Sequence, residues 1–388
     1  MSAITRRSFV GLLSAIPVVA ASALAAPQGA FAATPSVYST TFGPDGSHWP
    51  SRTPRPTDTF VKTIECDCTW AAIGNAITSL KDVAKNENVR ILVRPGRLAG
   101  NGAGSSVRPV LERVGQLGRG RRVLVMPRDG SQSITFDASL RLDRVFGVSF
   151  VGFWTFPFSL VLTGASDFSW AWSKGRAFNV STNELAAVSD FEFVECVTPE
   201  SQLTESDAWA TRTAGSTVTN LSIVGCYVAS MYKPAGSAAH LDTVQLSGTH
   251  ALKNVVVEDS VIFASTNAGF IPTELAGGVR FEHSLVVAGA TMMKRYPLPA
   301  GAKMSTNYPQ AANGSGTNGV LSARDSIMIG SVPGVWAAVE NSFTPAAKTY
   351  ANSGGWTYDP TLSEVSSAWL DARTPTPTDE YLRTVWKM

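Results

Sequence analysis

A short run of residues, His240-Leu241-Asp242-Thr243-Val244-Gln245, carries side chains suited to acid–base chemistry. Side chains alternate between the two faces of a β-strand, so His240 and Asp242 would share a face, with Gln245 near the end of the strand. A carboxylate beside an imidazole could orient a base, bind a hydroxyl or hold a cation. Asp242 and Gln245 could instead satisfy buried backbone groups at a structural corner. The sequence leaves both interpretations open, and we predict that Asp242 and His240 are catalytic.

Two long segments beside this run hold further candidates. Residues 197–218 carry several acidic side chains, and residues 227–246 carry Tyr232 and Lys233. Lys233 could act as a base if burial lowered its pKa, although loop lysines are usually solvated surface charges. Aromatic side chains in these segments would suit stacking on the face of a ring, although such side chains more often pack internally. We predict a catalytic role for Lys233 and substrate contacts for Gln245, Tyr232, Trp209, Arg212 and Glu274.

A repeated strand pattern indicates the fold that positions these residues. Six segments align without gaps, and in each the second and fourth residues are apolar, as one face of a strand requires. The seventh residue is Phe, Cys, Cys, Ser, Ser and Ser in turn. Strands stacked about 4.8 Å apart would place apolar columns in the core and a ladder of small side chains at the seventh position. The segments are residues 147–153, 190–196, 220–226, 254–260, 278–284 and 320–326.

The spacing of these segments predicts coils with loops inserted on one side. The shortest step, from Ser260 to Ser284, is 24 residues and corresponds to one coil, and a longer step then contains one coil plus an insertion. Outward positions such as Glu192, Ser222 and Arg280 should tolerate substitution. The fourth positions should form one inward column of Phe193, Ile223, Val257 and Phe281.

Capping elements are expected at both ends of this stack. Apolar residues recur every three to four positions over residues 67–84, which predicts an amphipathic helix with Asp67 or Thr69 as its N-cap. Valine-rich strands that end in proline follow at residues 89–96 and 122–127. A helix in this place would cover the apolar core and unpaired edges of the first coil. The tail from residue 345 should wrap the last coil through Tyr381, Leu382, Val385 and Trp386.

The helix, the valine-rich strands and the small-residue ladder together resemble the pectate-lyase-like superfamily, in its bacterial carbohydrate-active type. The resemblance implies an all-β fold, a right-handed parallel β-helix with an N-terminal capping helix and long loops inserted on one side. A β-sandwich also has short strands at regular intervals, but it explains the seventh-position column poorly. The run from His240 to Gln245 also looks like a recurrent feature of such proteins. The resemblance places an active site in a groove on the outer face of the sheets.

The resemblance also implies two kinds of chemistry. Lyases of this fold hold Ca²⁺ with Asp and Glu clusters while an Arg or Lys removes a proton, whereas the hydrolases pair two aspartates as acid and base. The sequence shows neither a dense aspartate cluster nor a calcium-site run. We therefore predict no cofactor, with Ca²⁺ possible if the protein is a lyase.

The predicted function is that of an exported polysaccharide-degrading enzyme, lyase or glycoside hydrolase, with a polysaccharide or oligosaccharide as its partner. The alternative is a non-catalytic carbohydrate-binding or cell-surface β-helix protein. An enzyme needs titratable groups that converge on one reacting centre, whereas a binding protein needs only aromatic rings and amides. Convergence of the candidate residues therefore distinguishes the two.

The first residues predict export. Arg6 and Arg7 precede Phe9 and an apolar run over residues 10–25, and Ala30-Phe31-Ala32 offers a cleavage site. The paired arginines resemble a twin-arginine signal, which exports folded proteins, with an ordinary secretory signal as the alternative. The apolar run is too short for a membrane span. We predict a secreted or cell-surface protein with a signal peptide (1–32), an N-terminal extension (33–65), a β-helix domain (66–344) and a C-terminal capping tail (345–388).

Charge and cysteine content limit the possible partners and cross-links. The net charge is +2 and only 16% of residues are charged, without a basic patch, which argues against nucleic acid as a partner. Four cysteines are too few for a disulfide scaffold, and their spacing matches no zinc motif. Cys196 and Cys226 would be neighbours on adjacent coils, as small buried side chains in preference to a disulfide.

Overall fold

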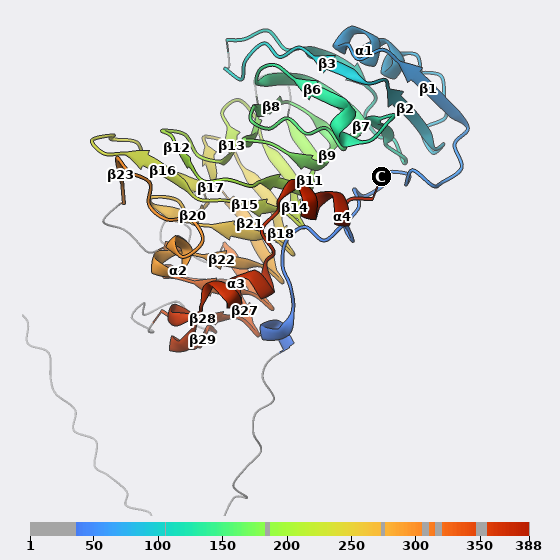
Figure 1. Ribbon diagram of the computed structural model, residues 1–388. Coiled ribbons are helices and arrows are strands. Elements are labelled where there is room, and N and C mark those ends of the chain that lie inside the picture. The colour runs from blue at the N-terminus through green and yellow to red at the C-terminus, as the bar shows by residue number, and fades with distance from the viewer. Residues whose placement is uncertain are drawn as a thin grey trace, which may run out of the picture. The chain divides into compact units, whose positions relative to one another are not determined.

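The computed structural model describes residues 36–104, 106–182, 187–272, 276–304, 310–314, 320–346 and 355–387. The predicted signal peptide (1–32) lies outside these residues. The described part is a right-handed parallel β-helix, as predicted, because successive strands pair in parallel and stack in three columns (Figure 1). Of the helices within the described residues, none combines the length and apolar character needed to cross a membrane.

A typical coil runs through column 1, column 2 and column 3 in that order. Column 1 contains β4 (Leu111–Gly115), the first half of β7 (Leu140–Val151), β8 (Ser159–Thr163), β10 (Ala177–Ser181), β13 (Trp209–Thr213), β17 (Asp242–Gly248), β20 (Ala268–Ile271) and β24 (Gln310–Ala312). The outer face of column 1 is where the candidate site lies.

Columns 2 and 3 complete each coil. Column 2 contains β1 (Lys62–Cys66), β2 (Val89–Val93), β5 (Val123–Pro127), the second half of β7, β9 (Ser166–Lys174), β11 (Val188–Thr198), β14 (Val218–Val224), β18 (Leu252–Glu258), β21 (Ala276–Glu282), β25 (Leu321–Arg324) and β27 (Ala338–Glu340). Column 3 contains the ends of β9 and β11, then β15 (Tyr227–Val228), β19 (Val261–Phe263), β22 (Leu285–Val287), β26 (Ile327–Ile329), β28 (Phe343–Thr344) and β29 (Thr357–Tyr358).

The remaining elements are short. One small sheet pairs β3 (Gly96–Leu98) with β6 (Ile134–Phe136), and another joins β16 (Met231–Pro234) to β12 (Gln202–Leu203) and β23 (Ala302–Lys303). The helices are α1 (Trp70–Thr78), α2 (Gly289–Met293), α3 (Ser367–Arg373) and α4 (Asp379–Val385), with 3-10 turns at Ser36–Ser39, Ser131–Ser133 and Pro360–Glu364.

The registers of column 2 confirm the predicted frame. Phe193, Ile223, Val257 and Phe281 pair in succession and are all buried, so they form the expected inward column. At the seventh position, each backbone N–H donates to the side chain of the next coil, from Cys196 N to Cys226 Sγ (3.3 Å) and from Cys226 N to Ser260 Oγ (3.0 Å). The same contact continues through Ser284, Ser326 and Ser342 at 3.1 to 3.3 Å. All four cysteines are free thiols.

One coil was missing from the predicted frame. Residues 167–173 lie between the first two aligned segments, with Phe168 paired to Val148 on one side and to Phe191 on the other. The 43-residue step between those segments is therefore two coils, and not one coil plus a loop. The coil fits the pattern, because Phe168 and Trp170 are buried at the second and fourth positions and Ser173 occupies the seventh. The coil starts only 20 residues after the preceding segment, which is fewer than the 24 residues predicted for one coil.

The capping helix forms where predicted but ends earlier. α1 starts after Thr69, whose side chain accepts a hydrogen bond from the backbone N–H of Ala72 (3.1 Å), and it buries Trp70, Ile73 and Ile77. The helix ends at Thr78, so the last predicted turns are not helical.

Left-handed backbone conformations form the corners between columns. Between columns 1 and 2 the corner residues include Asp190, Asn220 and Asn254, whose side chains are linked by hydrogen bonds of 2.8 and 3.0 Å. Asparagine and aspartate tolerate this conformation better than most residues. Between columns 2 and 3 the corner includes Glu195 (φ 54°) and Gly225 (φ 61°), followed by Asp259 and His283.

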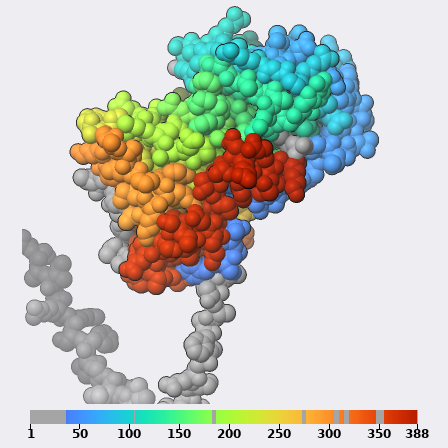
Figure 2. All heavy atoms as spheres, viewed as in Figure 1, coloured from blue at the N-terminus to red at the C-terminus, as the bar shows by residue number. Residues whose placement is uncertain are grey.

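The chain ends cover part of columns 2 and 3. Glu192 lies on the outer face, where it accepts hydrogen bonds from the buried Arg122 guanidinium (2.6 Å) and from Ser51 N (3.0 Å), so we expect its substitution to cost more than that of Ser222. The C-terminal tail also departs from the prediction. It runs back from the last coils toward the green coils of β9 and β11 (Figures 1 and 2), where Lys174 Nζ lies 2.8 Å from Asp379 Oδ1.

Candidate active site

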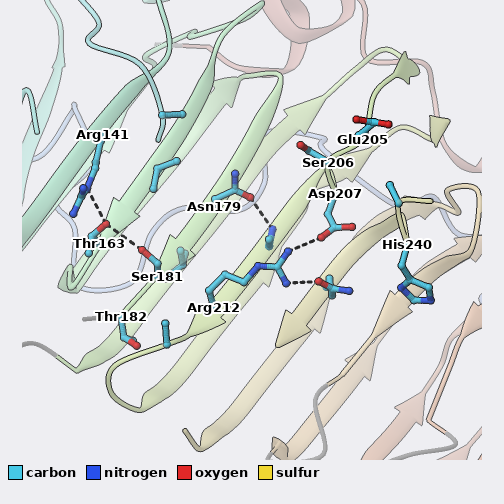
Figure 3. A pocket seen from close by; sticks show the side chains of 17 residues that line it. Arg141, Thr163, Asn179, Ser181, Thr182, Glu205, Ser206, Asp207, Arg212 and His240 are labelled. Atoms are coloured by element: carbon cyan, nitrogen blue, oxygen red, sulfur yellow. Dashed lines mark hydrogen bonds and ion pairs between the residues drawn. The ribbon is translucent and has the colours of Figure 1, made fainter. Parts of the chain in front are cut away.

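A cavity of about 760 Å³ lies on the outer face of column 1. Its floor is made of outward side chains in register, with Asn179, Ala210 and Gln245 in one row. Thr163, Ser181 and Arg212 form the next row (Figure 3). The central floor residues are small, so the strands leave a hollow there, and the larger side chains stand around it. The lining is completed by Ala103, Arg141, Val161, Val180, Thr182, Glu205, Ser206, Asp207, Ala214, Ala239 and His240.

A second hollow of about 350 Å³ adjoins this cavity. The two share Ala103, Val161, Asn179, Ser206 and Asp207 as lining residues, and together we call them the groove. Lining residues come from β7, β8, β10, β13 and β17, five neighbouring strands of column 1. At about 4.8 Å between strands, the groove crosses about 19 Å of sheet, which suits a chain-like ligand.

Asp207 projects into the groove from the segment before β13. Its Oδ2 atom lies 2.7 Å from Arg212 Nη2, and its Oδ1 atom accepts a hydrogen bond from the backbone N–H of Asp242 (2.9 Å). Arg212 also donates to Gln245 Oε1 and to Ser247 Oγ on β17. The side chain of Asp207 is 7% exposed and that of Arg212 is 41% exposed. Two adjacent coils therefore fix the orientation of a carboxylate that still reaches solvent.

Asp242 lies beneath the groove wall, fully buried. Its carboxylate accepts hydrogen bonds from Gln245 Nε2 (3.1 Å) and Asn267 Nδ2 (2.8 Å). Burial raises the pKa of the Asp242 carboxyl, against the opposing effects of the Asn267 hydrogen bond and the His240 charge, and Asp207 raises it further. Asp242 is not among the residues that line the groove, and its predicted catalytic role stays a prediction.

His240 is the titratable partner of this network at the surface. Its Nδ1 atom lies 3.2 Å from Asp242 Oδ2, and its Nε2 atom lies 2.8 Å from Asn267 Nδ2. The side chain is 59% exposed and lines the groove (Figure 3). The structure thus brings His240, Asp242, Gln245 and Arg212 together, as the predicted site requires.

Other predicted site residues lie elsewhere. Trp209 is the first residue of β13 and points inward, 2% exposed, with its ring centroid 5.1 Å from those of Phe178 and Phe193. Tyr232 is fully buried and donates its hydroxyl hydrogen to Tyr296 O (2.5 Å). Neither ring can offer a face to a sugar, so the stacking role predicted for both is wrong.

Lys233 is also outside the groove. Its Nζ atom donates to the carbonyl oxygen of Ala239 (3.1 Å), and the side chain lines neither hollow. Glu274 lies outside the described residues. On the outer face of column 2, Glu282 pairs with Arg280 and Arg324, and these charged side chains do not line the groove either.

Several groove residues were not predicted. Asn179 and Arg141 occupy outward positions of β10 and β7, which alternate in burial as half-buried strands do, so that alternation was the available signal. Asn267 lies in the turn before β20, and no sequence pattern links it to His240. The sequence does not distinguish Asp207 from the other acidic residues of the segment 197–218.

Comparison with known proteins adds little to this picture. No protein-family model matches the chain, and no curated protein matches it in sequence. Among solved structures, the chain is similar to the catalytic domain of a GH87 alpha-1,3-glucanase in complex with tetrasaccharides. That similarity has a TM-score of 0.27 and 10% identity, and it covers 76% of this chain and 60% of the glucanase chain. We draw no functional argument from a similarity of this size, and the function is argued from the groove itself.

Proposed function

We propose that this protein is a glycoside hydrolase that cleaves a carbohydrate polymer in the groove, with Asp207 at the reacting centre. One observation carries the proposal. Asp207, Arg212, Gln245 and His240 converge in one hydrogen-bonded network at the groove wall, held from beneath by Asp242. Convergent titratable groups are what an enzyme needs and a binding protein does not.

The groove lining supports a sugar chain as the ligand. Hydroxyl and amide side chains cover much of the floor, namely Thr163, Asn179, Ser181 and Gln245, and none of the described lining residues is aromatic. Such groups exchange hydrogen bonds with the many hydroxyls of a sugar, and a groove about 19 Å long accommodates several units.

Asp207 and His240 are proposed as the proton-transfer groups. Hydrolysis needs one group to protonate the leaving oxygen and another to take a proton from water. Asp207 lines the groove with its orientation fixed by Arg212 and by the Asp242 backbone, and His240 lines the edge of the same cavity (Figure 3). Asp242 and Asn267 act through His240 and Gln245 as positioning residues.

Hydrolysis fits the geometry better than elimination. Elimination beside a uronate carboxylate needs a base and a cation that can neutralise the carboxylate. Lys233, the base predicted for a lyase, is outside the groove. The two arginines of the larger cavity, Arg141 and Arg212, are paired with Asp143 and Asp207. Within the described residues, no three metal-ligating side chains converge in the groove to form a calcium site.

The decisive experiment screens the purified protein on acidic and neutral polysaccharides. New reducing ends without absorbance from unsaturated products support hydrolysis, whereas reducing ends with absorbance mean that the protein is a lyase. Asp207→Asn should abolish turnover in a protein that remains folded, although loss of the pairing with Arg212 should lower the melting temperature, while Asp82→Asn, an exposed acid outside the groove, should change neither. Binding without turnover across the whole panel would identify the protein as a carbohydrate-binding module.

We also propose that the protein works outside the cytoplasmic membrane. The proposal rests on Arg6, Arg7 and the apolar run that follows them. Replacing both arginines by lysine should retain the precursor in the cell, and unimpaired export would show that the twin-arginine route is not used.

A further inference from the structure

A second group of titratable side chains gathers at the corner between columns 2 and 3. The corner positions on successive coils are Glu195, Gly225 and Asp259, and the middle one has no side chain. The imidazole of His48, from the N-terminal segment, fills that gap, since a Cβ atom at Gly225 would lie only 2.5 Å from His48 Nδ1. His48 therefore sits between two carboxylates, one on the coil before and one on the coil after.

Three possible metal ligands meet at one ring nitrogen of His48. Its Nδ1 atom lies 2.8 Å from Glu195 Oε1 and 3.7 Å from Asp45 Oδ1, and the three ligand atoms lie within 4.8 Å of one another. A single N–H can serve one acceptor well, and 3.7 Å is too long for a second hydrogen bond. A metal ion bonded to Nδ1 would engage both carboxylates.

The charges around His48 call for a cation. Asp45, Glu195 and Asp259 are three carboxylates, and Glu195 is fully buried. Within the described residues, none of the three forms an ion pair with a lysine or an arginine, and the only side chains paired with them that could carry a positive charge are imidazoles. A buried carboxylate without a cationic partner is costly unless hydrogen bonds or a bound ion compensate it.

The surroundings match the support that metal ligands usually have. A histidine that binds a metal through one ring nitrogen commonly donates a hydrogen bond from the other to a carboxylate. His48 Nε2 lies 2.9 Å from Asp259 Oδ2. Ligating carboxylates are themselves hydrogen-bonded, and Glu195 Oε2 accepts from Trp386 Nε1 (2.7 Å) and from Gly46 N (3.0 Å). A polar cavity of about 380 Å³ lined by Asp45, His48 and Asp259 gives access from solvent.

We infer that Asp45, His48 and Glu195 form a zinc site that fastens the N-terminal segment to the β-helix. One imidazole and two carboxylates are usual zinc ligands, and a water molecule would complete a tetrahedral set. None of the three residues lines the groove, so the inference is independent of the proposed hydrolase activity.

A proton is the competing cation at this corner. Burial lowers the pKa of His48, but its hydrogen bonds to Asp259 and Glu195 outweigh that effect and raise the value to about 10. A protonated His48 would balance part of the negative charge without metal. A zinc ion would be bound by Asp45, whereas a proton on His48 would not need it. Asp45 is half exposed and lies too far from the ring for a hydrogen bond.

The test is calorimetric titration of Zn²⁺ into the metal-free full chain, with Co²⁺ absorption as a second readout. Asp45→Asn removes a ligand at an exposed position, and Asp325→Asn is the matched control, an exposed acid on the same corner. We expect one Zn²⁺ per chain, at least about ten-fold weaker binding by Asp45→Asn, and no change for Asp325→Asn.

Two results would overturn the inference. Equal binding by the wild type and Asp45→Asn would place zinc at another site, and no binding at all would leave the His48 imidazolium as the counter-charge. His48→Gln serves as the second variant, and melting curves in metal-free buffer verify that each variant is folded.

Discussion

Replacing Phe281 by alanine should lower the free energy of unfolding by about 4 kcal/mol. The ring is fully buried between Val257 and Ala323 on the neighbouring coils, and it packs edge-on against Phe270 at a centroid distance of 4.9 Å. Truncating a buried phenylalanine costs about 3 to 5 kcal/mol, and that range includes the roughly 0.5 to 1.5 kcal/mol of an aromatic pair. A small residue such as Ala323 on one side cannot fill the space.

Denaturant unfolding followed by tryptophan fluorescence measures this change, because Trp336 lies 6.2 Å from the Phe281 ring. The loss should shift the melting temperature by about 1 to 2 °C for each kcal/mol, because the unfolding entropy grows with chain length. Arg280→Ala is the control, since that side chain points outward, is 55% exposed and should cost less than about 1 kcal/mol. A loss below about 1 kcal/mol for Phe281→Ala, or equal losses for both variants, would refute the inward column.

Three further predictions concern the site and its supports. Burial raises the pKa of Asp242 above 3.8, so the folded state holds this proton more tightly than the unfolded state. The resulting stabilisation is fully present below pH 3.8 and is lost as the pH rises through the pKa of the folded state. Asp242→Asn should therefore reduce the pH dependence of the free energy of unfolding, measured by unfolding curves at several pH values. Trp209→Phe should lower stability without changing sugar affinity, since the ring is in the core; a selective loss of affinity in a binding assay would show otherwise. Gly225→Ala should cost about 1 to 3 kcal/mol and expose the segment around His48 to limited proteolysis, because its φ of 61° is strained for alanine; undiminished protease resistance would contradict this.

The fold was predictable because the same chemistry recurs at the same position of each coil. Phe193 and Phe281 share a column, and Cys226 and Ser260 share another, so the register was visible in the sequence without any structure. Coil length is less constrained, since a turn can lose residues without disturbing a strand. That freedom is why the coil containing Trp170 was overlooked.

The site was predictable only where its residues are close in the sequence. His240, Asp242 and Gln245 contact one another because they belong to one run. The burial of Asp242 follows from the register of β17, which places it on the same face as the inward Val244, whereas its contact with Asp207 on the previous coil could not be predicted from the sequence. Trp209 was predicted to contact substrate because residues 197–218 were treated as a single loop. The structure begins β13 at Trp209, and its side chain points into the core.

The attachment of both chain ends at Glu195 has a mechanical consequence. Gly46 and His48 near the N-terminus and Trp386 near the C-terminus all bind this one side chain, which belongs to a coil in the interior of the stack. Tension applied between the two ends would therefore load contacts to an interior coil as well as to the terminal ones. A pull on the N-terminal segment would first load its contacts with the last coils, where Tyr38 donates a hydrogen bond to Asp359 (2.7 Å) and packs against Phe343 (4.8 Å between ring centroids). The contacts at Glu195 would bear the load next, so the last coils and the anchoring at Glu195 should resist extension in sequence.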